Sequence, residues 1–346
     1  MKSIKIGKKV IKNFSKPYII AEACINHQGN FDLASEMVHI CKVSGCDAVK
    51  FQIHVLEDEM LMETPISKNF GKKSLYEALD STNLSIEQLK KLKVLSENLK
   101  IDFLCTPFSF KSCDQLVNEI GVQAIKVGSG EYTNLPLQKH IASKKKPMII
   151  SSGMTEMFEV KETYKLLKKL KVSFALMHCV SAYPCPYEIM NLGLIKKYIE
   201  LFDIPIGLSD HTPTIYTSLA AVGQGACIIE KHFTLDKTME GPDHKSSINP
   251  EELKELVNGC NAVFKSMGSK KIINNEEKEI LSWARESVVS IKNIKKGESF
   301  SNSNISVKRP SPGNNVVPAK SLDQVLGQKA RKKISVNKQV KWSDIE

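Results

Sequence analysis

The stretch that decides the fold is Ile204–Thr234, with the sequence IPIGLSDHTPTIYTSLAAVGQGACIIEKHFT. Two short apolar runs in it each continue into polar residues, and the small, apolar residues between them are typical of a helix. Strand, helix and strand in this order form the parallel unit of α/β proteins. His211 and His232 follow the two strands at matching positions. We therefore expect both imidazoles at one edge of the sheet, where they can share a divalent metal ion or cap strand ends with hydrogen bonds.

The same alternation repeats through the rest of the segment 17–267. Further strands are expected over 17–23, 48–53, 102–108, 124–127, 147–150 and 174–179, each followed by a helical pattern. Eight such units predict an α/β fold of the (β/α)₈ TIM-barrel type. An open doubly wound sheet would usually have fewer strands and a Gly-rich first turn, which is absent here. The segment 55–79 is long for a connecting loop, which favours a functional role for it.

Composition divides the chain into three parts. Residues 1–267 form the predicted TIM-barrel catalytic domain, with a hairpin over 1–16 in front of the barrel. Residues 268–284 are polar and predict a linker. Residues 285–346 alternate short β-like runs with Gly, Asn and Pro, which predicts a small β-rich domain. Its size is near the lower limit for independent folding, so we expect it to lean on the barrel or on another subunit.

Charge and cysteine usage limit the class of protein. The net charge is +11, and residues 285–346 hold 13 Lys and Arg against 5 Asp and Glu. No Arg-rich or aromatic-interleaved basic run occurs, which argues against nucleic acid and leaves anionic small molecules as partners. The 9 Cys are scattered singly, as in reduced cytosolic proteins. Without an apolar run for a signal peptide or a membrane span, we expect a soluble cytoplasmic protein.

Polar side chains follow nearly every expected strand. The carboxyl ends of barrel strands open to one mouth, so these residues should share one site. They are Glu22, Lys50, Gln52, Thr106, Lys126, Ser129, Glu131, Ser151, His178, Ser181, Tyr183, His211, Glu230 and His232.

Two lysines of this set favour a phosphate. Lys126 and Ser129 lie beside Gly128 and Gly130, whose backbone N–H groups can also bind an anion. A lone lysine beside a glycine turn is more often solvated. Because Lys50 adds a second lysine from an apolar strand, the balance moves to phosphate binding.

The remaining mouth residues allow several roles. Glu22 and Glu131 can transfer protons, orient water or pair with a lysine. Glu230 is a candidate third metal ligand or an orienting partner of His232. Gln52 and Tyr183 can bind sugar hydroxyls, although a tyrosine there can equally be packed into the core. Asp243 lies in a loop, Gly241–His244, that can close over a ligand or form a plain turn.

Five motifs in order resemble the sialic acid (N-acetylneuraminate) synthase family. They are IAEACINH at 20–27, KVGSGE at 126–131, SSGM at 151–154, GLSDHT at 207–212 and EKHFT at 230–234. The surroundings of Lys308-Arg309-Pro310 are similar to the C-terminal antifreeze-like (SAF) domain of that family. The resemblance covers nearly the whole chain.

The resemblance implies a reaction and a set of roles. Phosphoenolpyruvate, N-acetylmannosamine and water would give N-acetylneuraminate and phosphate, by a metal-assisted aldol-type addition with C–O cleavage. The metal would be Mn²⁺ or Mg²⁺, held by His211 and His232, and Arg309 would reach the partner's barrel in a domain-swapped homodimer. The implied contacts to phosphoenolpyruvate are Lys50, Thr106, Lys126, Ser129, Ser151, Ser181 and Ser209; those to the sugar are Gln52, Tyr183, Asp243 and Arg309; Glu22 and Glu131 would be catalytic.

Departures from the family pattern leave the acceptor sugar open. Ser181 stands where bacterial sialic acid synthases often carry Asn. A serine at this position resembles the animal-type and legionaminate-type branches instead. A sugar-contacting Asn of the family has no counterpart around 70–73, whereas Glu57–Met60 resembles the bacterial sialic acid branch. A 2,4-diacetamido-6-deoxyhexose, the precursor type of legionaminate or pseudaminate, is therefore the alternative acceptor.

Two other classes of protein agree less well with the sequence. A metal-dependent hydrolase would often carry a His-x-His pair on the first strand, which here ends in Glu22. A carbohydrate- or ice-binding protein would not need so many polar strand ends in a barrel mouth.

Overall fold

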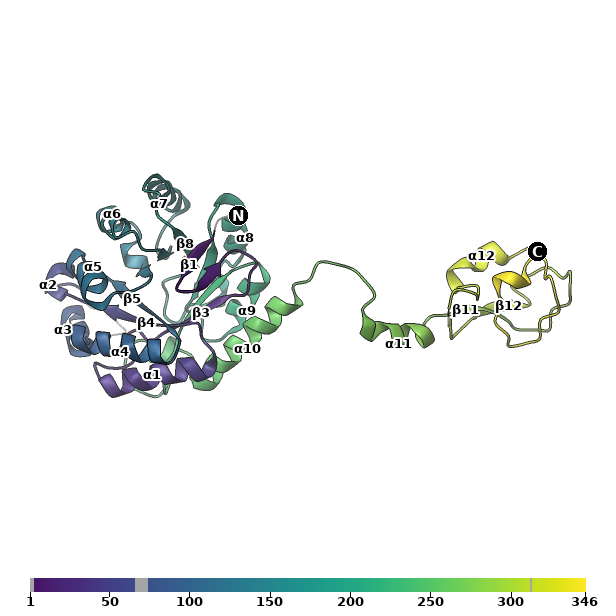
Figure 1. The fold of residues 1–346 in the computed structure, drawn as a ribbon, viewed down its shortest axis with the longest axis horizontal. Coiled ribbons are helices and arrows are strands. Elements are labelled where there is room, and N and C mark those ends of the chain that lie inside the picture. The colour runs from purple at the N-terminus through teal and green to yellow at the C-terminus, as the bar shows by residue number, and fades with distance from the viewer. Residues whose placement is uncertain (1–2, 66–73, 312) are drawn as a thin grey trace. The chain divides into compact units, whose positions relative to one another are not determined.

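The computed structural model describes residues 3–65, 74–311 and 313–346. They form two compact units that divide between Gly268 and Ser269 (Figure 1). The segment around 70–73, where a counterpart of the family's sugar-contacting Asn would be expected, lies outside the described residues, as do residues 1 and 2 of the predicted hairpin.

The first unit opens with an antiparallel hairpin. Strands β1 (Ile4–Ile6) and β2 (Lys9–Ile11) pair with each other, and Gly7 makes the turn with φ +55°. The buried isoleucines of the hairpin pack with residues of the barrel interior, such as Leu104 and Ile149. The hairpin therefore contributes to the apolar core inside the barrel.

Eight parallel strands form the barrel, which confirms the predicted fold class. They are β3 (Tyr18–Glu22), β4 (Ala48–Ile53), β5 (Asp102–Pro107), β6 (Ile125–Val127), β7 (Met148–Ser151), β8 (Phe174–Cys179), β9 (Ile206–Asp210) and β10 (Ile228–His232). Their hydrogen-bonded order is β5-β4-β3-β10-β9-β8-β7-β6. Because β5 and β6, the two ends of this order, also contact each other, the ring is nearly closed.

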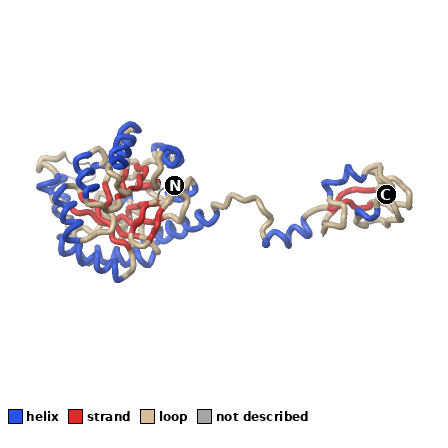
Figure 2. The backbone as a smooth tube through the Cα atoms, turned by 45° about the horizontal axis from the view of Figure 1, so that its top comes forward, coloured by secondary structure: helices blue, strands red, loops and turns tan. Residues whose placement is uncertain are grey.

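Helices surround the strands (Figure 2). They are α1 (Phe31–Ser44), α4 (Ile86–Asn98), α5 (Phe110–Gln115) with a π-helical end (Leu116–Ile120), α6 (Leu135–Ser143), α7 (Met157–Lys169), α8 (Gly193–Leu201), α9 (Tyr216–Gly223) and α10 (Pro250–Ser266). Local sequence fixes their ends: in α1, Asn30 accepts hydrogen bonds from two backbone N–H groups, and Gly45 ends the helix at φ +84°.

The long connection after β4 is partly helical, which corrects the prediction of a loop over 55–79. It contains α2 (Leu56–Glu59) and the start of α3 (Leu75–Thr82). Ser74 and Glu77 form a reciprocal capping box at the start of α3. The prediction missed these helices because each has barely one or two turns of periodic sequence.

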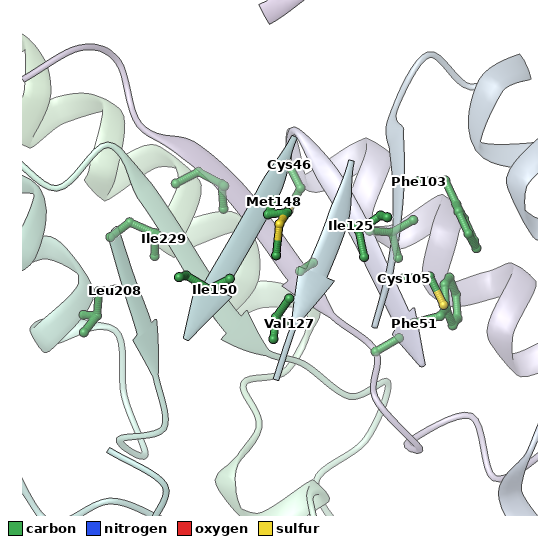
Figure 3. Close-up of a cluster of buried hydrophobic side chains, with 14 of the residues drawn as sticks. Cys46, Phe51, Phe103, Cys105, Ile125, Val127, Met148, Ile150, Leu208 and Ile229 are labelled. Atoms are coloured by element: carbon green, nitrogen blue, oxygen red, sulfur yellow. The ribbon is translucent and has the colours of Figure 1, made fainter. Parts of the chain in front are cut away.

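Alternation along each strand sorts side chains between two cores. One face packs against the helices, as Phe51, Val127 and Ile150 do (Figure 3). The other face fills the barrel interior. Toward the carboxyl ends, the cavity-facing positions change from apolar to polar. The pairs two residues apart are Ile20 and Glu22, Ala48 and Lys50, Leu104 and Thr106, Ala124 and Lys126, Ile149 and Ser151, and Ile228 and Glu230.

His178 does not face the mouth, contrary to the sequence prediction. It is buried, its Nε2 donates to the Met190 carbonyl oxygen at 2.7 Å, and its ring meets Tyr198 edge-on. Ala175 and Met177 are the β8 residues that pack inside the barrel. The strict alternation of strands explains the error, because neighbours of interior residues point outward.

The second unit contains a helix and a small sheet. Helix α11 (Asn275–Ala284) occupies much of the predicted linker, residues 268–284. Strands β11 (Ser287–Ser290) and β12 (Ile305–Lys308) are antiparallel, and the short helix α12 (Leu322–Val325) follows. The core of this unit is small and aliphatic apart from Phe300.

No helix in the described part of the chain is long and apolar enough to cross a lipid bilayer.

Candidate active site

One cavity of about 600 Å³ lies at the carboxyl ends of the barrel strands. It is lined by every barrel residue to which the family resemblance gives a role, namely Glu22, Lys50, Gln52, Thr106, Lys126, Ser129, Glu131, Ser151, Ser181, Tyr183, Ser209, His211, His232 and Asp243. Glu230 lines it as well, whereas His178 does not. The remaining candidate, Arg309, is an exposed residue of the second unit.

A buried cluster of charges forms one wall of the cavity. Glu230 Oε1 lies 3.2 Å from Lys50 Nζ and 3.4 Å from Lys126 Nζ, and it accepts a hydrogen bond from Ser209 at 3.1 Å. Lys50 also lies 3.0 Å from Glu22 Oε2. The sequence predicted a role for Glu230 beside His232; the structure also joins it to the two lysines.

The cluster alters the protonation of its carboxyl groups. Burial raises the pKa of Glu230, but Lys126 and Lys50 outweigh it and hold that pKa at about 2. For Glu22, burial outweighs Lys50 and raises the pKa to about 7. Glu230 is therefore the fixed counter-ion of the two lysines, and Glu22 can hold or release a proton near neutral pH.

Hydroxyl groups surround the lysines. Lys126 Nζ donates to Ser151 Oγ at 2.8 Å, and Lys50 Nζ lies 3.4 Å from Thr106 Oγ1. Gly153 N donates to Ser129 Oγ at 3.2 Å. A Cβ on Gly153 would come within 2.2 Å of Ser181 Oγ and 2.6 Å of Ser129 Oγ, so only glycine lets these hydroxyls approach. Two ammonium groups among several hydroxyls suit a phosphate or carboxylate ligand.

The two histidines lie side by side next to this cluster. Their ring centres are 5.3 Å apart. Imidazoles that share one tetrahedral ion have ring centres roughly 5 Å apart, because metal–nitrogen bonds are about 2.1 Å long. His211 Nδ1 donates to the Val180 carbonyl oxygen at 2.8 Å, which leaves Nε2 as its free nitrogen. The buried Nδ1 of His232 forms no hydrogen bond with the described residues. Both residues thus fit a metal site.

Residues on the opposite strand face hold the histidines in place. Asp210 and Lys231 are paired neighbours on β9 and β10, and their charged groups lie 3.3 Å apart with no solvent exposure. Asp210 also accepts hydrogen bonds from Thr217 and Ser218. Each of these two strands therefore carries a structural ion beside a cavity residue.

Cys24 and Asp243 extend the possible ligand set. One ligand atom each of Cys24, His232 and Asp243 lies within 4.8 Å of the others. Sequence reasoning counted Cys24 only as a buried thiol and gave Asp243 a sugar contact. A cysteine in an apolar segment carries no local signal that separates ligation from packing.

An amide, a further imidazole, a tyrosine ring and apolar groups also line or border the cavity. His54 Nε2 lies 3.0 Å from Gln52 Oε1, and its Nδ1 lies 2.9 Å from Glu59 Oε2. The ring of Tyr183 lies 4.2 Å from that of His211. Six apolar side chains also line the cavity, namely Ile25, Met60, Leu75, Leu79, Phe108 and Met154. Sequence reasoning missed His54 and Glu59, although both border or lie in the long connection that it singled out.

Glu131 lies in the cavity with a carboxyl oxygen that has no hydrogen-bond partner among the described residues. Burial, with help from Glu59, raises its pKa to about 7. The cavity thus contains two carboxyl groups, Glu22 and Glu131, that can act as acid or base near neutral pH.

A barrel mouth that combines buried lysines, paired imidazoles and carboxyl groups of raised pKa defines an enzyme of the TIM-barrel class. The model of the NeuB family matches residues 37–272, and that of the SAF domain matches residues 285–346. The chain belongs to the NeuB family, the nonulosonic acid synthases, which confirms the family predicted from the motifs.

Relatives in this family act on different sugars. The chain is 39% identical to the N,N'-diacetyllegionaminic acid synthase of Campylobacter jejuni, over 92% of this chain and 96% of that one. It is 39% identical to human N-acetylneuraminate-9-phosphate synthase, over 73% of this chain and 71% of that one. The crystal structure of the sialic acid synthetase from Leptospira borgpetersenii matches with a TM-score of 0.71 and 32% identity, over 81% and 95%.

Substitution of Glu230 tests the charge cluster. In Glu230→Gln, Lys126 stays buried without a carboxylate, and we expect the free energy of unfolding at pH 7 to fall by about 3–5 kcal/mol. Glu97→Gln breaks the surface pair with Lys93 and is the matched control, with an expected loss below about 1 kcal/mol. Urea unfolding of both variants measures this, and equal small losses would contradict the role of Glu230.

Substitution of Glu131 tests its raised pKa. The folded-state pKa of about 7 exceeds that of an unfolded glutamate, so the folded state retains a proton that the unfolded state loses. The stability of the wild type should therefore decrease as the pH rises through that window, whereas an amide at this position cannot titrate. We expect Glu131→Gln to gain stability relative to the wild type between about pH 5 and pH 8 in urea unfolding.

The exposed residue Glu188 provides the control, because Glu188→Gln also removes one carboxyl group. A stability difference between Glu131→Gln and wild type that stays constant over this pH range would show that Glu131 has no raised pKa.

Proposed function

We propose that the chain condenses phosphoenolpyruvate with the open-chain aldehyde of an acetamido hexose, and releases phosphate. The observation that carries this proposal is the pair of buried lysines joined by Glu230, next to two imidazoles in one cavity. Family membership favours a synthase over the hydrolase and the binding protein considered above.

Phosphoenolpyruvate is assigned to the lysine side of the cavity. Lys50 and Lys126 supply positive charge, while Glu230 cancels only part of it. The hydroxyl groups assigned to this substrate are those of Thr106, Ser129, Ser151, Ser181 and Ser209, and all of them line the cavity. Ser129 and Ser181 converge beside Gly153, which suits the compact oxygens of a phosphate group.

His211 and His232 are assigned to a divalent ion, Mn²⁺ or Mg²⁺ by resemblance to the family. A bound ion would supply Lewis acidity toward the aldehyde oxygen.

The chain's carboxyl groups would manage the protons. The methylene carbon of phosphoenolpyruvate forms a C–C bond with the aldehyde carbon, whose oxygen takes up a proton. Water adds to the former enol carbon and loses a proton to a base, for which Glu131 is the candidate with Glu22 nearby. The C–O bond to phosphate then breaks, leaving a 2-keto acid and inorganic phosphate. A carboxyl group with a pKa of about 7 can serve either step.

The acceptor sugar is assigned to the side with Gln52, Tyr183 and Asp243, with Arg309 as a further contact. Ile25, Met60, Leu75 and Leu79 line the cavity and pack in one apolar cluster with Cys24, which Gln52 contacts. A second acetamido methyl and a 6-deoxy carbon would bury apolar surface there, at about 25 cal/mol per Å². This favours a 2,4-diacetamido-6-deoxyhexose, in agreement with the similarity to the legionaminic acid synthase. N-acetylmannosamine, which the sequence resemblance favoured as the acceptor, becomes the second candidate. The similarity to the neuraminate-9-phosphate synthase supports it.

Phosphate release from phosphoenolpyruvate tests the function. The full chain with Mn²⁺ should release phosphate only when an acceptor is present, and 2,4-diacetamido-2,4,6-trideoxymannose should give the highest kcat/KM. N-acetylmannosamine, its 6-phosphate and N-acetylglucosamine complete the panel. Higher kcat/KM for N-acetylmannosamine would reverse the order of the two candidates, and no acceptor-dependent release would contradict the synthase.

We also propose that Arg309 acts in the barrel of a partner subunit, as the family resemblance implies. Mixed dimers of Arg309→Ala and Glu131→Ala chains would then contain one barrel with both groups intact. Activity of roughly one quarter to one half of the wild type is expected after mixing, whereas each variant alone should be inactive. Absence of recovery in dimers verified by mass spectrometry would place Arg309 in its own chain's site.

A further inference from the structure

Cys24 occupies an unusual backbone conformation at the mouth of the barrel. It comes two residues after the end of β3, and its φ is +47°, in the left-handed region that favours glycine. A non-glycine residue in such a conformation costs of order 1 kcal/mol, and such residues cluster at functional sites. The thiol is what distinguishes this residue from the glycine that the backbone would accept most readily.

Strand pairing brings this thiol to one of the two histidines assigned to the metal. β3 and β10 are parallel neighbours in which Glu22 pairs with His232, so the residues just after β3 lie beside the end of β10. Asp243 comes from the loop after β10 and lies within the same group of ligand atoms, none more than 4.8 Å from another. His232 is 7% exposed, and its Nδ1 has no hydrogen-bond partner among the described residues.

A chain of hydrogen bonds turns a donor toward the sulfur. Gln52 Nε2 lies 3.1 Å from Cys24 Sγ, while Gln52 Oε1 is held by His54 Nε2 at 3.0 Å. His54 is in turn held by Glu59. The Gln52 NH₂ group thus lies within hydrogen-bond distance of Cys24 Sγ, and such a donor favours a sulfur that carries negative charge. Outer contacts of this kind orient metal ligands.

We propose that Cys24 is a thiolate ligand of the divalent metal, together with His232 and Asp243 and next to His211. The inference rests on the proposed function and deepens its metal site. On binding, the S–H bond is replaced by a sulfur–metal bond and the proton passes to solvent. Asp243 keeps a second carboxyl oxygen for a sugar hydroxyl.

A thiolate changes which ions the site prefers. Mg²⁺ favours oxygen ligands, whereas sulfur together with imidazole and carboxylate suits Zn²⁺, Co²⁺ and Fe²⁺. The full chain should therefore bind Zn²⁺ and Co²⁺ more tightly than Mg²⁺, by a margin that depends on Cys24.

Cobalt spectroscopy of the full chain tests this ligand set without reference to catalysis. Co²⁺ added to metal-free wild type should produce a thiolate-to-cobalt charge-transfer band in the near ultraviolet. Cys24→Gly should lose the band and bind Co²⁺ at least about 10-fold more weakly in competition with a chelator, because even outer partners are worth roughly 10- to 100-fold. Its affinity for Mg²⁺ should change far less.

Cys179→Ser is the matched control. In the wild type, Cys179 Sγ is the other sulfur near the imidazoles, 3.8 Å from His211 Nδ1, but we do not expect it to be a ligand. This variant should keep the charge-transfer band. Cys24→Gly relieves the left-handed strain, so in the absence of metal it should be at least as stable to urea as wild type; Cys24→Ser repeats the measurement with a side chain retained.

Three outcomes would overturn the proposal: a charge-transfer band that survives in Cys24→Gly and Cys24→Ser, a band lost in Cys179→Ser instead, or cobalt bound by wild type without any such band. Phosphate release with the acceptor panel is a separate readout. The cobalt experiment can therefore contradict the thiolate ligand without contradicting the synthase activity, and the phosphate assay can contradict the synthase activity without contradicting the ligand.

Discussion

The active site depends on one buried carboxylate, that of Glu230, which lies between two buried ammonium groups. A lysine removed from water needs a nearby counter-charge, and Glu230 supplies it to both Lys50 and Lys126 through a single oxygen. Glu22 adds a second carboxyl group beside Lys50, but its pKa of about 7 makes its charge variable. The cluster is thus short of negative charge whenever Glu22 is protonated, and an anionic substrate can supply it.

Strand alternation determines where this chemistry lies. In β10, Glu230 and His232 face the cavity while Lys231 between them pairs with Asp210 on the outer face. The interior positions of the same strands are filled with apolar side chains deeper in the barrel. The fold therefore supplies a rigid apolar base, and each strand contributes a polar group only at its last positions. Candidate site residues from different strands therefore meet without long loops to hold them.

The sequence was sufficient to predict the fold and most of the residues that line the cavity. It was not sufficient to predict which of these residues contact one another. The eight alternating strand and helix patterns predicted the barrel, and the polar residues after the apolar strands predicted most of the polar residues that line its cavity. Period-two alternation predicts which face of a strand a residue occupies, but not which side chain it contacts. The contacts of Glu230 with the two lysines were therefore not predicted. His178 was misplaced although the same alternation, with Met177 inside, carried the signal. The left-handed conformation of Cys24 has no signature in sequence at all.

The most direct measurement of the central claim is calorimetric titration of phosphoenolpyruvate into the full chain. Lys126→Met removes one of the two ammonium groups at the phosphate side, and Lys196→Met changes an exposed lysine of α8 as a control. We expect Lys126→Met to weaken binding at least about 10-fold, since a charged hydrogen bond contributes roughly 1.5–3 kcal/mol, while Lys196→Met should bind as wild type does. Equal affinity of all three proteins for phosphoenolpyruvate would contradict the central claim.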